Sequence, residues 1–576
     1  MTSSTTVPPT LEPSEPLQIA IIGAGLTGLT LALSISALPL HQRSHLHYTI
    51  YESHQHYSEI GAGIGFGASG HRIMKLLHPE FWENYKTIAN WGEDDVWWDF
   101  VVGDKVGNSQ GIAGEKWEGK RIAQVRMKEG REGQSTAHRR SLMDILIKLL
   151  PSSCDVRFGK RLTGIVSSTS DVHSISDHPN SKVTLQFQDG TTSTADLVIG
   201  ADGVKSLCRD IVITPTCNAE ALKARFTGKI AYRGLIPMEE ARARIGEKAG
   251  QRMFYLGHGG HVVSFPVEGG KSMNIVAFAN REEGVWEGGW VRENVGEELE
   301  RDYLDGRWGD DVEGIMRLIK SPSYWATFYH PPAPTFHHPT LPILLIGDAA
   351  HTTAPHFGQG AGLGIEDVYI LTKLLSHLPT TSHSSDASSN LRALFTAYTQ
   401  IRQPRATNAV STANYYGRML DMEDPVISDN LSLIGEKVRG IAETIWGYDE
   451  IGEGERAVEI MRGKLAENEM KDGKTRNDDV VEREMKDGKT RNDDVVEPFL
   501  LFSAASGYPL RIQHSERFTY LNNPIEQFKV RAISSLTMFN MAMSWGITPV
   551  RVPAPMYDMS KLPATPHQLL WTLLMT

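Results

Sequence analysis

A glycine fingerprint near the amino terminus constrains the fold of this chain more than any other feature. Residues 19–22 form a short apolar run typical of a buried parallel strand, and Gly23, Gly25 and Gly28 follow in the spacing G-x-G-x-x-G. A helical pattern of apolar residues begins directly after Gly25. Glycine at these positions permits a tight turn, and it lets backbone amides and the positive end of a helix approach a pyrophosphate. The stretch therefore predicts a Rossmann-type α/β unit.

A carboxylate completes the fingerprint. Residues 47–51 alternate like a second strand and end at Glu52, about where an acid binds a ribose hydroxyl in such units. The glycine spacing alone also occurs in turns of unrelated α/β folds. Because a strand, a helix and an acid accompany it here, we predict a dinucleotide site.

Three later stretches are also rich in glycine, and two of them contain an acid after a buried strand. Residues 59–70 are dense in glycine with apolar residues interleaved. Residues 197–203 end in Gly-Ala-Asp-Gly and contain Asp202, and residues 344–351 end in Gly-Asp-Ala-Ala-His and contain Asp348. Glycine loops let the backbone lie against a flat or anionic ligand. Asp348 could equally cap the helix that follows it.

Changes of pattern along the chain predict a Rossmann-type domain interrupted by a second domain. Residues 225–330 return to strand-like alternation, and a long helical pattern begins at Leu391. Residues 81–120 contain five tryptophans in polar, irregular sequence, which we interpret as strands and loops over a cleft. The predicted segments are a disordered leader at 1–16, the first part of the dinucleotide-binding domain at 17–220, a substrate domain at 221–335, the return of the dinucleotide-binding domain at 336–375, a helical region at 391–460, a charged insert at 468–497 and a tail at 498–576.

The charged insert is an internal duplication. Residues 468–482 and 483–497 differ only at Asn468 against Arg483, and each copy is poor in apolar residues. Two copies are too few to form a solenoid. We predict a solvated helix or a disordered insert without a catalytic role.

Composition excludes several classes of function. The net charge is −11 and no basic stripe is present, which argues against nucleic acid as a partner. The three cysteines, Cys154, Cys208 and Cys217, lie in no C-x-x-C spacing, so we expect a reducing compartment and no metal site. No apolar run is long enough to span a bilayer, and proline and glycine interrupt the apolar tail. We expect a cytoplasmic protein without membrane contact.

The three loops that contain an acid occur in an order typical of one family. Over residues 17–415 the chain resembles single-component FAD-dependent monooxygenases of the para-hydroxybenzoate hydroxylase fold, and among them the salicylate-hydroxylase-like enzymes of fungal secondary metabolism. The resemblance implies an α/β fold. A Rossmann-type FAD-binding domain would hold an inserted, mostly antiparallel β-sheet substrate domain and continue into a helical C-terminal region.

The resemblance also implies FAD contacts. Gly23, Gly25, Gly28 and Glu52 would hold the ADP half of the cofactor. Arg139 matches a flavin-binding arginine, although Arg140 beside it leaves the register open. The other implied contacts are Gly65, Asp202, Asp348, Ala361 and Gly362.

The activity that the resemblance implies is hydroxylation, or dearomatisation, of a phenolic or aromatic-acid substrate in secondary metabolism. NADPH or NADH would reduce FAD, and O2 would then form a flavin C4a-hydroperoxide that transfers oxygen to the ring. The cofactor provides this chemistry. The protein must bind the phenol, make it more nucleophilic and exclude water.

Two residues are candidate catalytic groups. Arg233 matches a substrate-pocket arginine of fungal phenol-dearomatising enzymes, and a guanidinium there would hold a phenolate or carboxylate. His356 matches the Pro-His pair of salicylate-hydroxylase-like enzymes, and with a pKa near 6.5 it could take a phenol proton. The alternatives are a surface ion pair for Arg233 and a structural histidine for His356. On a strand, Tyr232 alternates away from Arg233, so we expect only one of them to face the cleft.

Other functions stay open at this stage. A flavoprotein of the same fold could epoxidise or oxidise an apolar terpenoid, and a binding protein could use the fold without catalysis. Relatives often have Tyr-Pro where this chain has Phe265 and Pro266, so the resemblance does not identify the substrate. The sequence leaves oligomeric state and the choice between NADH and NADPH undetermined.

Overall fold

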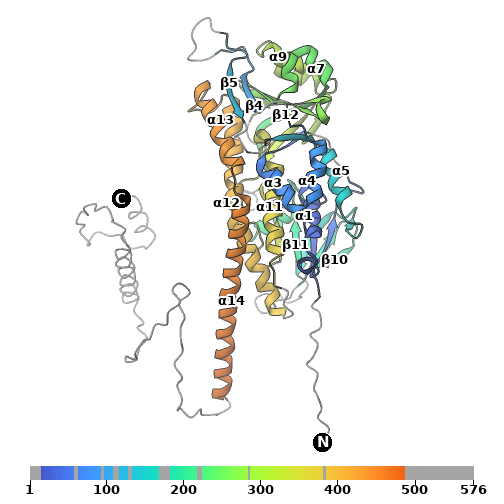
Figure 1. The fold of residues 1–576 in the computed structure, drawn as a ribbon, viewed down its shortest axis with the longest axis vertical. Coiled ribbons are helices and arrows are strands. Elements are labelled where there is room, and N and C mark those ends of the chain that lie inside the picture. Colours follow the sequence, from blue (N-terminus) through green and yellow to red (C-terminus); the bar gives the residue numbers. More distant parts are fainter. Residues whose placement is uncertain are drawn as a thin grey trace, which may run out of the picture. The chain divides into compact units, whose positions relative to one another are not determined.

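The computed structural model describes most of the first 486 residues (Figure 1). Side chains are described up to residue 470, except for residues 357 and 384–386. Residues 1–14 of the predicted leader, the duplicated insert from residue 487 onward and the predicted tail lie outside the described residues. The described ranges are 15–57, 63–91, 96–107, 116–126, 133–167, 182–216, 223–282, 286–379 and 384–486.

A parallel sheet forms the centre of the dinucleotide-binding unit. Its five strands stand in the order β18-β11-β1-β2-β7, and every neighbouring pair is parallel. This arrangement is the Rossmann-type sheet that the glycine fingerprint predicts. The strands are β1 (Leu17–Ile22), β2 (Leu46–Tyr51), β7 (Asp155–Arg157), β11 (Leu197–Gly200) and β18 (Ile343–Leu345).

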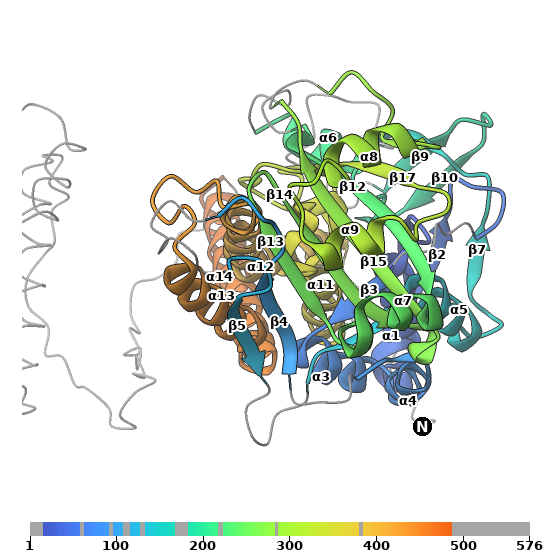
Figure 2. The ribbon, with the colours of Figure 1, turned by 90° about the horizontal axis from the view of Figure 1, so that it is seen from above.

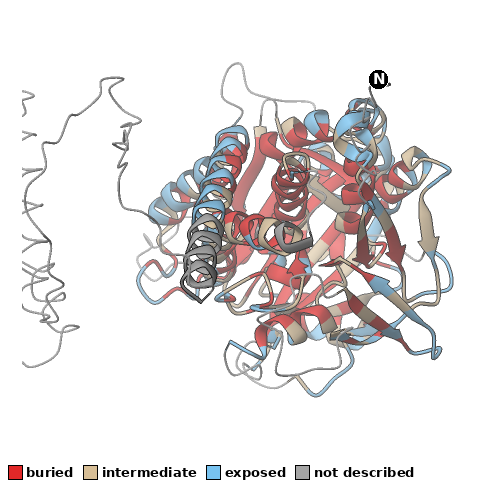
Figure 3. Ribbon diagram, turned by 90° about the horizontal axis from the view of Figure 1, so that it is seen from below, coloured by how far each residue is buried: buried red, intermediate tan, exposed pale blue. Residues whose placement is uncertain are grey.

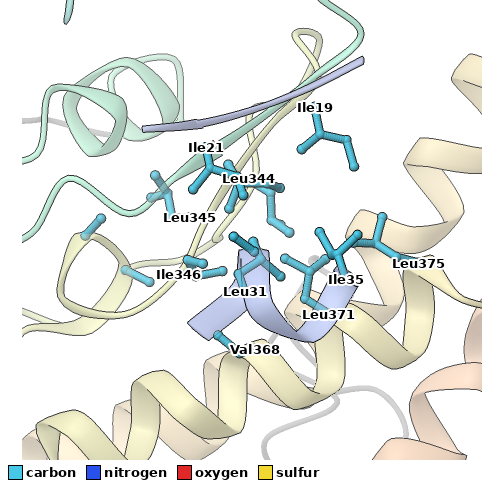
Figure 4. Close-up of a cluster of buried hydrophobic side chains, with 14 of the residues drawn as sticks. Ile19, Ile21, Leu31, Ile35, Leu344, Leu345, Ile346, Val368, Leu371 and Leu375 are labelled. Atoms are coloured by element: carbon cyan, nitrogen blue, oxygen red, sulfur yellow. The ribbon is translucent and has the colours of Figure 1, made fainter. Parts of the chain in front are cut away.

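Helices α1 (Leu26–Ala37) and α11 (Gly360–Leu375) cover this sheet and share its apolar core. Both helices are buried along most of their length because each packs against the sheet and against the other. Figure 4 shows the core between them, formed by Ile19, Ile21, Leu31, Ile35, Leu344, Leu345, Ile346, Val368, Leu371 and Leu375. The core fixes where the loops after β1 and β18 lie.

Smaller elements surround the parallel sheet. Two of them are antiparallel sheets, β8-β9-β10 and β3-β6. Their strands are β3 (Gly63–Phe66), β6 (Ser135–His138), β8 (Leu162–Ser167), β9 (Val183–Phe187) and β10 (Thr192–Ala195). The accompanying helices are α2 (Leu40–Arg43), α3 (Ala68–Leu77), α4 (Pro79–Ile88), α5 (Arg139–Leu149) and α6 (Leu207–Ile213).

Helix α4 corrects one sequence interpretation. Strands and loops were expected over residues 81–120, but the first part of that stretch is helical. Pro79 occupies the first turn, where its missing N–H costs nothing. Phe81, Trp82 and Tyr85 then lie on one buried face. The helical spacing of these aromatic residues was not recognised in the tryptophan-rich sequence.

A second sheet has eight strands in the order β16-β17-β12-β15-β14-β13-β4-β5 (Figure 2). Its neighbouring strands are antiparallel except for β13 and β4. Helices α7 (Met238–Ile245), α8 (Gly296–Tyr303) and α9 (Asp310–Met316) enclose an apolar core with it. The strands are β4 (Val96–Val102), β5 (Arg121–Arg126), β12 (Arg225–Pro237), β13 (Met253–Gly257), β14 (Gly260–Val267), β15 (Ser272–Asn280), β16 (Val291–Glu293) and β17 (Ser323–Tyr329).

Three long helices follow the sheets. They are α12 (Ser384–Leu420), α13 (Leu431–Trp446) and α14 (Glu450–Lys486), and α14 runs through the first copy of the duplication. Helix α13 packs against β5 and so joins the helical region to the eight-stranded sheet. Buried residues concentrate in the sheets and in the helices between them (Figure 3). Within the described residues, no helix is both long and apolar enough to cross a membrane.

A buried ion-pair network joins α11 to α12. Asp367 accepts a hydrogen bond of 2.7 Å from Nε of Arg402, and the other guanidinium nitrogens of Arg402 reach Glu366 and the carbonyl of Leu363. Arg405 adds two bonds to Glu366, of 3.1 and 3.0 Å. Arg402, Asp367 and Glu366 are all at most 1% exposed. Removing one partner of such a network leaves an uncompensated buried charge.

We therefore expect Arg402→Leu to destabilise the protein by about 3–5 kcal/mol. Urea unfolding followed by circular dichroism would show this as a lower midpoint. Arg392→Leu is the matched control, because Arg392 lies exposed on the same helix. Its effect should stay within about 0.5 kcal/mol. Equal shifts for both variants would contradict the importance of the network.

Candidate functional site

Two adjoining cavities lie at the carboxyl ends of the parallel strands. The first cavity, which Glu52 borders, has a volume of about 590 Å³. The second cavity, which Arg233 borders, has a volume of about 650 Å³. Both are bordered by Gly25, His54, Ala201 and Gly203, so they adjoin, and we refer to the two together as the cleft. Ligands of open α/β sheets bind outside the carboxyl ends of the strands, where the loops converge.

The first cavity contains the acid of the fingerprint. The carboxylate of Glu52 accepts hydrogen bonds from the backbone N–H of Ala24 at 2.9 Å and from that of His54 at 2.8 Å. Burial alone would raise the pKa of Glu52, but these bonds and the His54 ring hold it below its usual value. Glu52 therefore presents a negative charge at neutral pH, which suits the acceptor of a ribose hydroxyl.

The fingerprint glycines fulfil two different requirements. Gly23 has φ of 109°, and a Cβ there would lie 2.5 Å from the carbonyl oxygen of Ala201. A Cβ on Gly28 would collide with the carbonyl of Gly23, so both positions need glycine for the fold itself. A Cβ on Gly25 would meet no protein atom within 4 Å. The free space beside Gly25, at the start of α1, fits a pyrophosphate against the helix amides.

Asp202 is bound mainly to its own loop. Its carboxylate accepts hydrogen bonds from Oγ of Ser206 at 2.5 Å and from the N–H of Cys208 at 3.1 Å. Burial raises the pKa of Asp202. The residue borders the first cavity, and its bonds hold the start of α6, where Ser206 is the N-cap. Its contact with a cofactor stays a prediction.

The loop after β18 brings several predicted residues to the second cavity. It contains α10 (Asp348–His351) and a short 3-10 helix, η4 (Pro355–Phe357), and it ends at the start of α11. Asp348, His356 and Ala361 all border the cavity. Because α11 begins at Gly360, its free N–H groups and positive end lie at this cavity.

Asp367, on α11, holds this loop in place through hydrogen bonds. It accepts hydrogen bonds from the N–H of Gly347 at 2.8 Å and from Nε2 of His351 at 2.6 Å, in addition to the bond from Arg402. Burial alone would raise the pKa of Asp367, but His351 and Arg402 hold it below its usual value. The charged carboxylate thus connects the strand end, α10 and α12.

Arg233 lies on β12 and borders the second cavity. Its guanidinium carbon lies 4.2 Å from the centroid of the Trp325 ring. Burial, and then repulsion from Arg139, lower the pKa of Arg233 to about 10. Among the described residues no carboxylate forms an ion pair with Arg233, so the surface ion pair considered from the sequence is absent there. Tyr232 points away and bonds to Asp302, as alternation predicts.

His356 is more buried, and its pKa is lower, than expected from the sequence. The side chain is 3% exposed, and its ring lies 4.5 Å from Phe278 and 5.2 Å from His261, measured between centroids. Burial, and then the nearby His261 and Lys229, hold the pKa of His356 well below 6.5. The expectation of a pKa near 6.5 is therefore wrong, because a buried site with cations nearby disfavours imidazolium. Nδ1 of this neutral ring has no hydrogen-bond partner within the described residues.

The structure divides the predicted site residues into groups. Gly28 and Gly362 border neither cavity, and a Cβ on Gly362 would contact Gln359 within the loop. Gly23, Gly25, Glu52 and Asp202 border the first cavity. Gly25, Gly65, Arg139, Arg233, Asp348, His356 and Ala361 border the second. Arg140 borders the first cavity while Arg139 borders the second, so the two arginines face different parts of the cleft.

Sequence reasoning missed several lining residues of the second cavity. Gln134 and Thr136 come from the segment that contains β6. Trp98 on β4, by contrast, belongs to the tryptophan-rich stretch that was expected over a cleft. Tyr416 and Trp446 come from α12 and α13. The apolar spacing of these helices was visible in the sequence, but which turn faces the sheet depends on helix packing.

The described residues contain no metal-binding group, that is, no cluster of three or more His, Cys, Asp or Glu side chains that could hold a metal ion. Ionisable groups of both signs border each cavity. The first is bordered by Glu52, Asp144 and Asp202 together with Arg140, Lys160, Arg161 and Lys205. The second is bordered by Arg139 and Arg233 together with Asp348. The arrangement suits a ligand with hydroxyl and phosphate groups at one end and an anionic aromatic at the other.

Comparisons with known proteins show similarity to FAD-dependent monooxygenases. A family model described as an FAD binding domain matches residues 337–413. The chain is 34% identical over 440 residues to the 6-methylsalicylate 1-monooxygenase of Aspergillus terreus, across 76% of this chain and 90% of that relative. It is 32% identical over 449 residues to a salicylate hydroxylase of Pseudomonas putida, across 75% of this chain and 92% of that relative.

A solved structure of a salicylate hydroxylase is also similar to this chain. The structure of a salicylate hydroxylase in complex with its substrate matches with a TM-score of 0.64 at 29% identity. The match covers 77% of this chain and 98% of that one.

The free space beside Gly25 generates a prediction. Gly25→Ala should leave the folded protein intact, because the added Cβ meets no protein atom within 4 Å. It should weaken FAD binding by at least about tenfold, since the methyl group lies where the backbone would approach the pyrophosphate. FAD titration of the apoprotein, monitored by flavin fluorescence, measures this.

Gly463→Ala serves as the control, because Gly463 is exposed on α14 and its Cβ would also meet no atom within 4 Å. Its FAD affinity should equal that of the unaltered protein. Unchanged FAD affinity in Gly25→Ala would show that the cofactor does not approach this turn.

Proposed function

This chain belongs to the salicylate-hydroxylase-like FAD-dependent monooxygenases, and we propose that it hydroxylates a phenolic or aromatic-acid substrate with NAD(P)H and O2. In such a reaction one oxygen atom enters the ring and the other leaves as water, and NAD(P)H provides the two electrons. The observation that supports an anionic aromatic substrate is Arg233, whose guanidinium borders the second cavity without an acidic partner among the described residues.

The first cavity and the glycine loops fit FAD. Glu52 would accept hydrogen bonds from ribose, and the turn at Gly25 would receive the pyrophosphate. Asp348 and the start of α11 would face the ribityl and ring end. When bound, FAD supplies hydride acceptance and oxygen activation. The free N–H groups at the start of α11 would stabilise negative charge beside the ring.

Arg233 would hold the substrate. It is already stacked on Trp325, so its guanidinium is oriented before substrate binds. A carboxylate or phenolate placed between Arg233 and Arg139 would relieve the repulsion that lowers the pKa of Arg233. Such charge-assisted hydrogen bonds are stronger than neutral ones, and burial strengthens them further.

His356 would orient the phenol. Because its ring is neutral, a nitrogen without a proton can accept a hydrogen bond from a phenol O–H and increase electron density on the ring. Gly417 leaves the space that the imidazole occupies, since a Cβ there would collide with the His356 ring. Phe265 and Phe278 line the same space and exclude water.

The test of the proposal is the spectrum and turnover of the purified protein. We expect a yellow protein whose NAD(P)H oxidation and O2 uptake rise with a phenolic acid, and 18O from labelled O2 should appear in the product. A colourless protein that takes up no FAD would overturn the proposal and favour a binding protein of this fold. A flavoprotein that ignores phenols but oxidises a terpenoid would favour the terpenoid alternative.

Arg233→Ala should raise KM for a hydroxybenzoic acid at least about tenfold, because a charge-assisted bond contributes about 1.5–3 kcal/mol. A phenol without a carboxyl group should be affected less. Steady-state kinetics with both substrates measure the difference. Arg225→Ala, at the exposed start of the same strand, is the control and should change neither KM. The same loss for both substrates would contradict a role in binding the carboxylate.

His356→Asn should lower kcat by about 100-fold, the usual contribution of a positioned acid–base group. Since the pKa of His356 lies well below 6.5, the deficit should be the same throughout about pH 6–8. A pH profile of kcat for both proteins checks this. An acidic limb near pH 6.5 that disappears in the variant would show instead that His356 titrates during turnover.

A further inference from the structure

The second cavity extends much further along the eight-stranded sheet than one aromatic ring requires. Lining residues come from every strand between β17, with Trp325, and β5, with Val125. Six inter-strand steps separate these two strands. Neighbouring strands lie about 4.8 Å apart, so the lined face is roughly 29 Å wide.

Charge is confined to one part of this cavity. Arg233 lies on β12, and Arg139, Asp348 and His356 lie in or beside the glycine loops. The parts of β13, β4, β5 and α13 that border the cavity contribute only apolar or aromatic side chains, namely Phe254, Trp98, Phe100, Val125, Ala442 and Trp446. Since Nε1 of Trp98 donates to Gln134, that indole does not need a polar partner in the ligand.

Helix α13 closes the far end of this apolar part. Gly435 lets α13 approach β5, because a Cβ there would lie 2.7 Å from the carbonyl oxygen of Ile122. Trp446 is fixed by Trp97, with ring centroids 4.7 Å apart, and by Gly67, which leaves space for its indole. Between these contacts lies Ala442, a small residue that is 3% exposed and borders the cavity. The small side chain of Ala442 therefore leaves space at this end that a larger residue would fill.

We propose that the substrate is a phenolic acid with an extended apolar substituent. Arg233 binds the acid group, and the substituent lies along β14, β13 and β4 and ends against Ala442. The inference rests on the proposed hydroxylation, because the glycine-loop side of the cavity is assigned to FAD. The apolar side chains of β13, β4 and β5 would otherwise line a water-filled space, which is unfavourable.

A homologous series of salicylic acids tests the proposal on the unaltered holoenzyme. The series carries hydrogen, methyl, propyl, pentyl or heptyl at the 6-position, and Kd is measured from the perturbation of the flavin spectrum. Each buried methylene should tighten binding by about fourfold until the end of the cavity is reached. A Kd that is constant or rises with chain length would overturn the inference.

The same series separates this inference from the proposed function. Oxygen incorporation into salicylic acid without any gain from longer chains would overturn only the apolar-substituent proposal. Absence of flavin reduction and oxygen incorporation with every member would overturn the hydroxylase proposal as well.

Ala442→Trp fills the end of the cavity and tests the location of the substituent. The ratio of Kd for the heptyl compound to Kd for salicylic acid should rise at least about tenfold, because the last methylenes lose their contacts. Leu433→Trp is the control, since Leu433 is 38% exposed on the same helix, and it should leave the ratio unchanged. An unchanged ratio in Ala442→Trp would overturn the proposed location.

Loss of FAD from purified Ala442→Trp would indicate misfolding rather than a blocked cavity. Val125→Phe then replaces it, because Val125 lines the cavity from β5 and the change adds less volume. The same rise in the ratio of Kd values is expected, and an unchanged ratio in a flavin-loaded Val125→Phe would overturn the proposed location.

Discussion

One buried carboxylate determines the geometry of the candidate site. Asp367 binds the N–H of Gly347, Nε2 of His351 and Nε of Arg402, so it connects the end of β18, helix α10 and helix α12. The loop between them brings Asp348 and His356 to the second cavity. Because Asp367 and Arg402 are fully buried, the network tolerates no missing partner. The buried ion pair therefore positions the loop of the candidate site.

Charged groups of both signs border the cleft, and their surroundings affect them differently. Glu52 stays ionised at the nucleotide end because backbone N–H groups bond to it, whereas Arg233 remains a cation at the sheet end despite burial. His356 is neutral because burial and neighbouring Lys229 disfavour its protonation. The environment of each group shifts its pKa and so decides whether the side chain is charged at neutral pH. The cations that border the first cavity suit the phosphates of FAD, and Arg233 suits the anionic substrate proposed above.

Much of the fold was predictable because it depends on local chemistry. The family, the dependence on FAD and the Rossmann-type sheet with a mostly antiparallel second sheet are confirmed by the relatives and the structure. Helix α4 was missed because aromatic residues obscured its period. The roles of Arg233, His356 and the other site residues remain predictions, although the structure places both of these side chains at the second cavity.

The sequence by itself determined the turns that accept a dinucleotide, because Gly23 and Gly28 satisfy short-range steric requirements within one strand–helix unit. It also determined the acids that follow the strands, and that Tyr232 and Arg233 lie on opposite faces of β12, since strand alternation is local. Only the tertiary structure decided the pKa of His356 and the joining of α13 to the cavity. Both depend on contacts between segments far apart in the chain, such as His356 with His261 and α13 with β5. Burial and helix register arise when those segments pack together, so no local pattern encodes them.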